Sequence, residues 1–196
     1  MARNTEQRRA ELRTRLIDAA EATIVEDGLA ALKARALAKE AGCAVGAIYT
    51  IFDDLDQLTM AVNARTFRRL GAFVKEATDG TDGTARLVAM GHGYLHFAEA
   101  NTNAWRALFD LRMSSDMAVP DWYLAELAQV FALIATPLQE RHPDWPPARV
   151  QLLTRTLFSS VHGIVLLGLE RRISAVPIDQ LETMIELLLT RAISSD

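Results

Sequence analysis

The 196-residue sequence contains a single cysteine, Cys43, which excludes an intrachain disulfide. No uninterrupted apolar run approaches the roughly 18 residues that would span a bilayer. Residues 1–15 are charged and are not followed by the apolar stretch of a signal peptide. We therefore expect a cytoplasmic protein with no membrane partner.

Motifs that carry catalysis are also absent: there is no phosphate-cradling glycine loop, nucleophile elbow or cysteine cluster. We therefore predict no enzymatic activity, no catalytic residues and no cofactor. His92 and His96 are four residues apart, a spacing at which two imidazoles can share a metal, and Glu99 follows. A third ligand would have to come from elsewhere, with His162 the obvious imidazole. We predict no metal site, and a metal-binding helical bundle stays as the alternative.

The net charge of −4 argues at first against a nucleic-acid partner, but its distribution is more informative. Residues 1–70 carry 11 Lys or Arg and 10 Asp or Glu, whereas residues 71–196 carry 10 and 15. Within the first segment, residues 1–15 hold five arginines and two glutamates. A basic N-terminal arm on a neutral head, attached to an acidic body, would suit contact with a polyanion at one end.

Apolar residues recur at helical spacing along the whole chain, and no alternating strand pattern of useful length occurs. Gly28 and the Asp79–Gly83 stretch are the clearest helix breakers. We predict an all-α fold of about nine helices, with a three-helix head and a C-terminal helical bundle. Besides two short helices near residue 42, the expected helices cover residues 6–27, 55–78, 84–100, 103–115, 121–141, 147–171 and 178–194.

The most informative stretch is residues 28–58. A short helical pattern that ends at Ala41 meets Gly42, and a second short pattern runs from Val45 to Phe52. Two short helices joined by a tight glycine-containing turn are typical of a helix-turn-helix. In that motif the second helix lies in the major groove of DNA and presents side chains to base edges.

This stretch resembles the DNA-binding domain of the TetR family of transcriptional regulators. The residues that carry the resemblance are Ala19, Ala20, Gly28, Leu37, Ala38, Ala41, Gly42, Gly46, Ile48, Tyr49, Phe52 and Leu58. Two later segments, residues 103–109 and 161–164, are similar to the WHG-type C-terminal domain of some members. The resemblance implies a DNA-binding domain at residues 10–70 and a ligand-binding and dimerisation domain at residues 71–196.

By the same resemblance, the protein is expected to be a ligand-responsive repressor that binds a palindromic operator on double-stranded DNA. An unknown small-molecule effector would release it. The alternative is a ligand- or metal-binding helical protein whose degenerate head has lost operator binding. The predicted DNA-binding residues are Lys33, Ala34, Arg35, Ala44, Val45, Gly46, Ala47, Tyr49 and Thr50.

Several of the family's polar DNA anchors are replaced. Lys33-Ala34 stands where a capping threonine is usual, Ala44 where serine is common, and Ile51 where histidine is common. Leu55 occupies the place of a phosphate-binding lysine, among Asp53, Asp54 and Asp56. Either the head binds DNA weakly, or Lys33, Arg35, Lys39 and the N-terminal arm compensate; we favour compensation.

The remaining expectations concern the dimer interface and the ligand site in the C-terminal two-thirds of the chain. Apolar stripes in residues 150–168 and 181–192 suit either plain core helices or a four-helix interface with a second copy. A helix-turn-helix reader normally uses two copies, so we favour a homodimer through residues 147–194. The predicted ligand-binding residues are aromatic or polar-tipped: His96, Trp105, Phe109, Met113, Phe131, Phe158 and His162.

Overall fold

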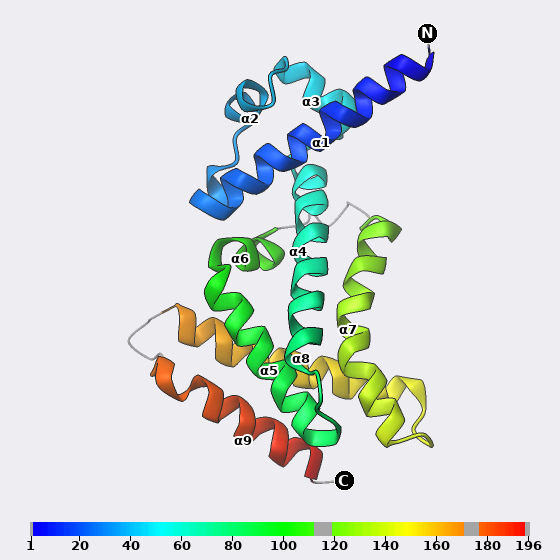
Figure 1. Ribbon diagram of the computed structural model, residues 1–196, viewed down its shortest axis with the longest axis vertical. Helices are drawn as coiled ribbons and strands as arrows, with labels where there is room; N and C mark the ends of the chain where they lie inside the picture. The colour runs from blue at the N-terminus through cyan, green and yellow to red at the C-terminus, as the bar shows by residue number, and fades with distance from the viewer. Residues whose placement is uncertain (1, 112–118, 171–176, 195–196) are drawn as a thin grey trace. The chain divides into compact units, whose positions relative to one another are not determined.

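The computed structural model describes residues 2–111, 119–170 and 177–194. Within them the chain forms nine α-helices and two short 3-10 helices, with no β-strand, which confirms the all-α prediction (Figure 1). The helices are α1 (Ala2–Asp27), α2 (Ala34–Glu40), α3 (Val45–Ile51), α4 (Leu55–Ala77), α5 (Gly83–Ala100), α6 (Thr102–Asp110), α7 (Asp121–Arg141), α8 (Pro147–Leu169) and α9 (Leu181–Ser194); the 3-10 helices are η1 (Leu29–Ala31) and η2 (Ile178–Gln180).

The expected helix over residues 103–115 ends at Asp110, because Leu111 already has an extended backbone. The rest of that expected range, residues 112–115, lies outside the described residues. The chain divides into two compact units, residues 1–67 with 101–125, and residues 68–100 with 126–196. The predicted domains, residues 10–70 and 71–196, remain a prediction, and the structure adds that α6 packs with the first unit.

The turn between α2 and α3 follows from Gly42. This glycine has a φ of 65°, in the left-handed region where a side chain is strained. The Gly42 N–H donates to the Lys39 carbonyl oxygen and the Cys43 N–H donates to that of Ala38. These two bonds form a Schellman motif, which closes the C-terminal end of a helix and redirects the chain. Figure 1 shows α2 and α3 as two short helices beside α1.

The first unit has its own apolar core, and α6 is part of it. Leu16, Ala20, Ile48 and Phe52 are buried there together with Ala107 of α6. The side-chain amide of Asn103 at the start of α6 donates to the carbonyl oxygens of Val25 and Glu26, both at 3.1 Å. Because the last carbonyls of a helix lack partners within it, Asn103 caps the end of α1.

In the second unit, α9 packs against α5 and α8 through a buried stripe of Leu181, Ile185 and Leu189. Glycines on the two opposing helices allow this close approach. A Cβ atom at Gly91 of α5 would lie 2.5 Å from Cγ2 of Ile185, and one at Gly168 of α8 would lie 2.5 Å from Cδ1 of Leu181. A larger residue at either position therefore requires the contacting side chain, or α9 itself, to shift.

Helix α8 is, among the described residues, the one helix long and apolar enough by length and composition to cross a bilayer. Less than a third of its apolar stretch is buried in the single chain. Long core and interface helices of helical bundles have the same composition. The buried residues of α8 recur at helical spacing and include Val150, Leu157, Val161 and Val165, so one side of the helix packs in the second unit.

Candidate functional site

The helix-turn-helix presents the nine predicted DNA-binding residues on its surface. Seven of them are exposed, and Ala34 and Ala47 are half-buried. Tyr49 is 50% exposed, whereas Ile48 and Phe52 on the opposite side of α3 are buried in the core. The Thr50 hydroxyl donates to the Ala47 carbonyl oxygen at 2.7 Å, so its lone pairs remain as acceptors on the surface. The core contacts therefore fix which face of α3 points outward.

Neither short helix has a side-chain N-cap. Lys33 and Ala44 occupy the N-cap positions of α2 and α3, and neither side chain bonds a backbone N–H. The exposed amides at the start of α3 thus carry the partial positive charge of a helix N-terminus, which favours an anion such as a phosphate. The replacement of the usual polar caps by Lys33-Ala34 and Ala44 leaves these amides for an external partner.

Arginines of α1 contact the helix-turn-helix instead of forming a separate arm. Arg15 donates from Nε to the Ala41 carbonyl oxygen at the end of α2, at 3.2 Å. Arg9 donates to the Thr50 carbonyl oxygen at the end of α3, at 3.1 Å. Both contacts place a positive charge at the C-terminal end of a helix, where it is stabilising. The basic residues 1–15 belong to α1, which begins at Ala2, and their contact with DNA stays a prediction.

The acidic residues before α4 have a structural role that the sequence analysis missed. The Gln57 N–H donates to Oδ1 of Asp54 at 2.6 Å, and the Asp53 N–H donates to Oε1 of Gln57 at 3.0 Å. Asp54 is thus the N-cap of α4, and the Gln57 side chain reaches back to the residue before the cap, one position earlier than in a standard capping box. Burial and, secondarily, the neighbouring Asp54 carboxylate raise the pKa of Asp56. The Asp54-x-x-Gln57 spacing in the sequence would have indicated the cap.

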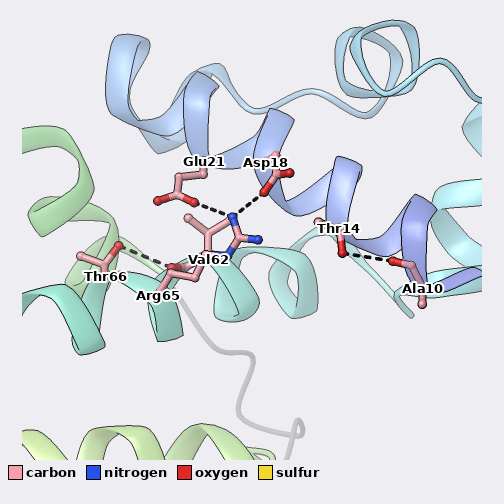
Figure 2. A network of polar contacts seen from close by, with 7 residues as sticks. All are labelled: Ala10, Thr14, Asp18, Glu21, Val62, Arg65 and Thr66. Carbon is pink, nitrogen blue, oxygen red and sulfur yellow. Dashed lines mark hydrogen bonds and ion pairs between the residues drawn. The ribbon is translucent and has the colours of Figure 1, made fainter.

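A second polar contact joins α4 to α1 (Figure 2). One guanidinium nitrogen of Arg65, Nη1, lies 2.6 Å from the Asp18 carboxylate and 2.7 Å from that of Glu21. Asp18 and Glu21 are three residues apart on α1, so both carboxylates face Arg65. Burial lowers the pKa of Arg65, but its bonds to Glu21 and Asp18 raise it overall. This contact fixes α4 against α1 beside the helix-turn-helix.

The second unit encloses a cavity of about 60 Å³ between α4, α5, α7, α8 and α9. Aliphatic side chains make up most of its lining, together with the aromatic residues Tyr94 and Phe158. The lining residues are Leu70, Val74, Leu87, Met90, Gly91, Tyr94, Val130, Leu133, Ile134, Leu157, Phe158, Val161 and Leu189. Concave apolar sites with few polar groups are the usual form of a small-molecule site.

Three of the predicted ligand-binding residues come together at this cavity. Phe158 lines it, and its ring packs edge-on against Phe131 and is stacked on His162, with centroid distances of 5.1 and 5.6 Å. The other four do not join this cluster. His96 is exposed, Trp105 and Phe109 belong to the first unit, and Met113 lies outside the described residues. The sequence signal for the missed lining is the Met90–Tyr94 pair, one turn apart on α5.

Tyr94 connects the cavity to His162. Its hydroxyl lies 2.8 Å from Nδ1 of His162. Burial lowers the pKa of His162, so the imidazole is neutral at pH 7 and its Nδ1 can accept the Tyr94 proton. This hydrogen bond fixes the Tyr94 side chain against α8.

The two histidines considered as metal ligands both contact Glu182 of α9. His96 Nε2 lies 2.6 Å from Oε1 of Glu182, and His92 Nε2 lies 3.2 Å from the Glu182 carbonyl oxygen. Among the described residues, no group of three or more His, Cys, Asp or Glu side chains is arranged to hold a metal ion. The four-residue spacing of the histidines therefore serves the α5–α9 contact in this structure.

Two family models match the chain. The model of bacterial regulatory proteins of the tetR family matches residues 16–62, and the model of the tetracyclin repressor-like C-terminal domain matches residues 87–192. The first match covers the helix-turn-helix and the beginning of α4. The second covers most of α5 through α9, including the cavity residues Tyr94 and Phe158.

Individual proteins also resemble this chain, either in sequence or in fold. An uncharacterized HTH-type transcriptional regulator from Mycobacterium bovis is 36% identical over 80 residues, 40% of this chain and 41% of that protein. The match thus spans about two-fifths of the curated relatives' length. A TetR transcriptional regulator from Rhodococcus sp. RHA1 shares the fold with a TM-score of 0.66 at 19% identity, covering 96% of this chain and 97% of that one. A second Rhodococcus sp. RHA1 protein, of unknown function, has a TM-score of 0.72 at 24% identity, covering 93% of this chain and 95% of that one.

Proposed function

Because the chain belongs to the tetR family of bacterial regulatory proteins, we propose that it is a ligand-responsive repressor that binds a palindromic operator as a homodimer. The membership makes it a DNA-binding transcriptional regulator, and no enzymatic role is proposed. The observation that carries the proposal is the exposed face of α3, which is set by the buried Ile48 and Phe52 on its other side. We expect it to act on chromosomal DNA in the cytoplasm.

The predicted DNA contacts divide into two groups by chemistry. Lys33, Arg35, and the amides at the start of α3 would bind phosphates and fix the position of the head. Val45, Gly46 and Thr50 would lie against base edges, through apolar contact, close approach and the Thr50 lone pairs. We place the Tyr49 hydroxyl on a phosphate, because half of this side chain is exposed at the same surface.

Substitution of Tyr49 tests this assignment. Removing one hydrogen bond to a charged group costs about 1.5–3 kcal/mol, so Tyr49→Phe is expected to weaken operator binding by roughly 10- to 150-fold for each half-site. Tyr49→Ala should weaken it at least as much, and neither variant should unfold the dimer. Gel-shift titration measures the binding, and circular dichroism checks the fold. Unchanged binding by Tyr49→Phe would remove the phosphate contact from the model of the interface.

The dimer is proposed to form through α8 and α9, at residues 147–194. Leu152 and Leu167 of α8 and Leu187 of α9 are 68%, 50% and 59% exposed in the single chain. A shallow apolar depression near Leu187 is lined by Ile164, Met184 and Leu188. Large apolar side chains exposed on the surface in this number favour a protein interface. A symmetric pair of such faces would form a four-helix contact.

Sedimentation of matched arginine variants tests the dimer. Leu187→Arg places a charge in the proposed interface and is expected to give a monomer at micromolar concentration. Leu124→Arg makes the same change at a leucine of α7 that is 46% exposed and outside the interface. This control should sediment as the unmodified protein does. A dimer that survives Leu187→Arg would place the interface elsewhere.

The operator proposal is tested by selecting bound DNA from a random pool with the full-length protein. A palindromic consensus with half-sites about one helical turn apart, roughly 34 Å, is expected from a two-fold dimer. An asymmetric consensus would contradict the two-fold arrangement. No enrichment at low salt would support the alternative of a degenerate head without operator binding.

A further inference from the structure

The cavity of the second unit is lined almost entirely by apolar surface. Among the described residues that line it, none carries a charge and Tyr94 alone has a hydrogen-bonding side chain. The Tyr94 hydroxyl is bonded to Nδ1 of His162 at 2.8 Å. Because so little of the lining surface is polar, Tyr94 contributes mainly its ring to the cavity wall. A ligand in the cavity therefore meets carbon atoms and almost no hydrogen-bonding group.

Water is a poor occupant of a cavity with this lining. A buried water molecule typically makes about three hydrogen bonds, and this lining offers almost no partners for them. Apolar cavities lined by side chains such as Leu, Ile and Phe stay dry and bind small hydrocarbons instead. A hydrocarbon that enters such a site leaves bulk water and displaces no bonded water, and both effects favour its binding.

Ligand groups that form hydrogen bonds or carry charge are disfavoured at the same place. A hydroxyl, an amide or a ring nitrogen would give up its bonds to water and find almost no partner in the lining. An ionised group would lose its hydration without gaining a counter-charge, which costs still more. The lining thus selects for the hydrocarbon part of a molecule and against its polar parts.

The volume of the cavity limits the size of the group it can hold. A water-sized group needs about 10–15 Å³ on this scale, so 60 Å³ has room for about four to six heavy atoms. Met90, one of the lining residues, has a flexible and polarizable side chain that can repack around groups of different shape. The fit is therefore set by size and apolarity more than by an exact outline.

We propose that this cavity is the effector site and that it takes a compact, uncharged hydrocarbon group of about four to six carbon atoms. Any polar group of the effector stays outside the cavity. This inference rests on the proposed ligand-responsive function and names the chemical class of the ligand. The hydrocarbon is held by burial against the apolar side chains of the second unit, and no specific hydrogen bond is needed.

Benzene and pyridine test the class on the full-length protein without DNA. The two molecules have the same shape, but pyridine has a nitrogen in place of one C–H group, and it is uncharged at about pH 8. Benzene is expected to bind saturably in calorimetric titration. Pyridine should bind at least about tenfold more weakly, which corresponds to about 1.4 kcal/mol, because its nitrogen loses water without gaining a donor. Equal binding of pyridine, or no saturable binding of benzene, would overturn the proposal.

Two further measurements locate the binding. In nuclear magnetic resonance of isotope-labelled methionine methyl groups, benzene should shift the signal of Met90 and leave that of Met60, buried in the first unit, unchanged. Leu133→Phe fills the cavity and should weaken benzene binding by about tenfold or more, whereas Leu124→Phe, at an exposed leucine of α7, should leave it unchanged. A shift at Met60 alone, or full benzene binding by a folded Leu133→Phe protein, would place the ligand elsewhere.

Operator release connects the cavity with the proposed function. Saturating benzene should weaken operator binding by roughly fivefold or more, the lower end of the usual coupling between two sites. An unchanged operator affinity would overturn the assignment of this cavity to the effector. The probe titrations need no operator, so a failure of DNA binding leaves the hydrocarbon class standing. Conversely, a protein that binds a palindromic operator but not benzene keeps the repressor proposal and rejects this ligand class.

Discussion

The N-cap at Asp54 makes a quantitative prediction, because its carboxylate accepts a backbone N–H at the start of α4. Asp54 accepts the Gln57 N–H at 2.6 Å and so caps α4, the helix that carries Arg65. Replacing an N-cap Asp by Ala costs about 1 kcal/mol, within a range of roughly 0.5–2, whereas Asn caps about as well as Asp. Asp54→Ala and Asp54→Asn lose the same charge but differ in the cap.

For a protein of this size, 1 kcal/mol corresponds to roughly 2–4 °C in Tm. Asp54→Ala is therefore expected to melt about 2–4 °C below Asp54→Asn in differential scanning calorimetry at pH 7. If the two variants melt within half a degree of each other, the bond from Gln57 does not stabilise α4 and the capping argument is refuted. The Asp56→Asn variant controls for loss of an adjacent charge without loss of the cap.

The same variants separate stability from DNA binding. If Asp54 and Asp56 lie near the phosphates, Asp54→Asn and Asp56→Asn should each bind operator DNA more tightly at low salt, and the gain should shrink as salt screens the charges. Fluorescence anisotropy at 50 and 200 mM salt measures this. A gain that is the same at both salt concentrations would mean that the carboxylates do not act on DNA through their charge.

Three further predictions concern stability. Gly91→Ala forces a Cβ to within 2.5 Å of Ile185 and should destabilise the protein by about 1–3 kcal/mol. Gly163→Ala, whose Cβ meets open space in α8, should stabilise it by roughly 0.5–1 kcal/mol. Urea unfolding measures both changes in the free energy of unfolding, and equal effects would contradict the packing argument. Burial lowers the pKa of His162, so the unfolded chain takes up a proton below about pH 6.5 and the folded chain does so only at lower pH. Stability should therefore fall as pH decreases from 7 toward 5.5, and His162→Gln should flatten that dependence in calorimetry; an unchanged slope would assign it to other groups. Asn103→Ala removes two partly exposed bonds to the end of α1 and should cost about 0.5–1.5 kcal/mol by thermal melting, and no loss would show that water replaces the cap.

Local sequence patterns predicted most of the helices because helical periodicity and helix breakers are short-range signals. The left-handed turn at Gly42 and the buried positions of Ile48 and Phe52 follow from residues within a few turns of one another. Family membership was likewise carried by this local stretch. Each of these features depends on residues that lie close together in the sequence.

Short-range sequence patterns do not predict where α6 packs or where the cavity lies. Trp105 and Phe109 were predicted at the ligand site, but α6 packs with α1 in the first unit. That placement depends on partners some 80 residues away, such as the bonds from Asn103 to Val25 and Glu26. An apolar cavity wall such as Leu133 has the same sequence pattern as a filled core, so only the packing distinguishes them.

Because α6 contributes to the first unit, it affects how the head of such a protein could be exchanged for that of another. A chimaera joined after residue 70 would keep α1 to α3 but lose Ala107 from the core and Asn103 from the end of α1. A DNA-reading head transplanted in that way would carry an exposed apolar patch and two uncapped carbonyls. Recombination, in the laboratory or in evolution, would have to move α6 together with α1 to α3, because the folded head is encoded by two separate segments of the gene.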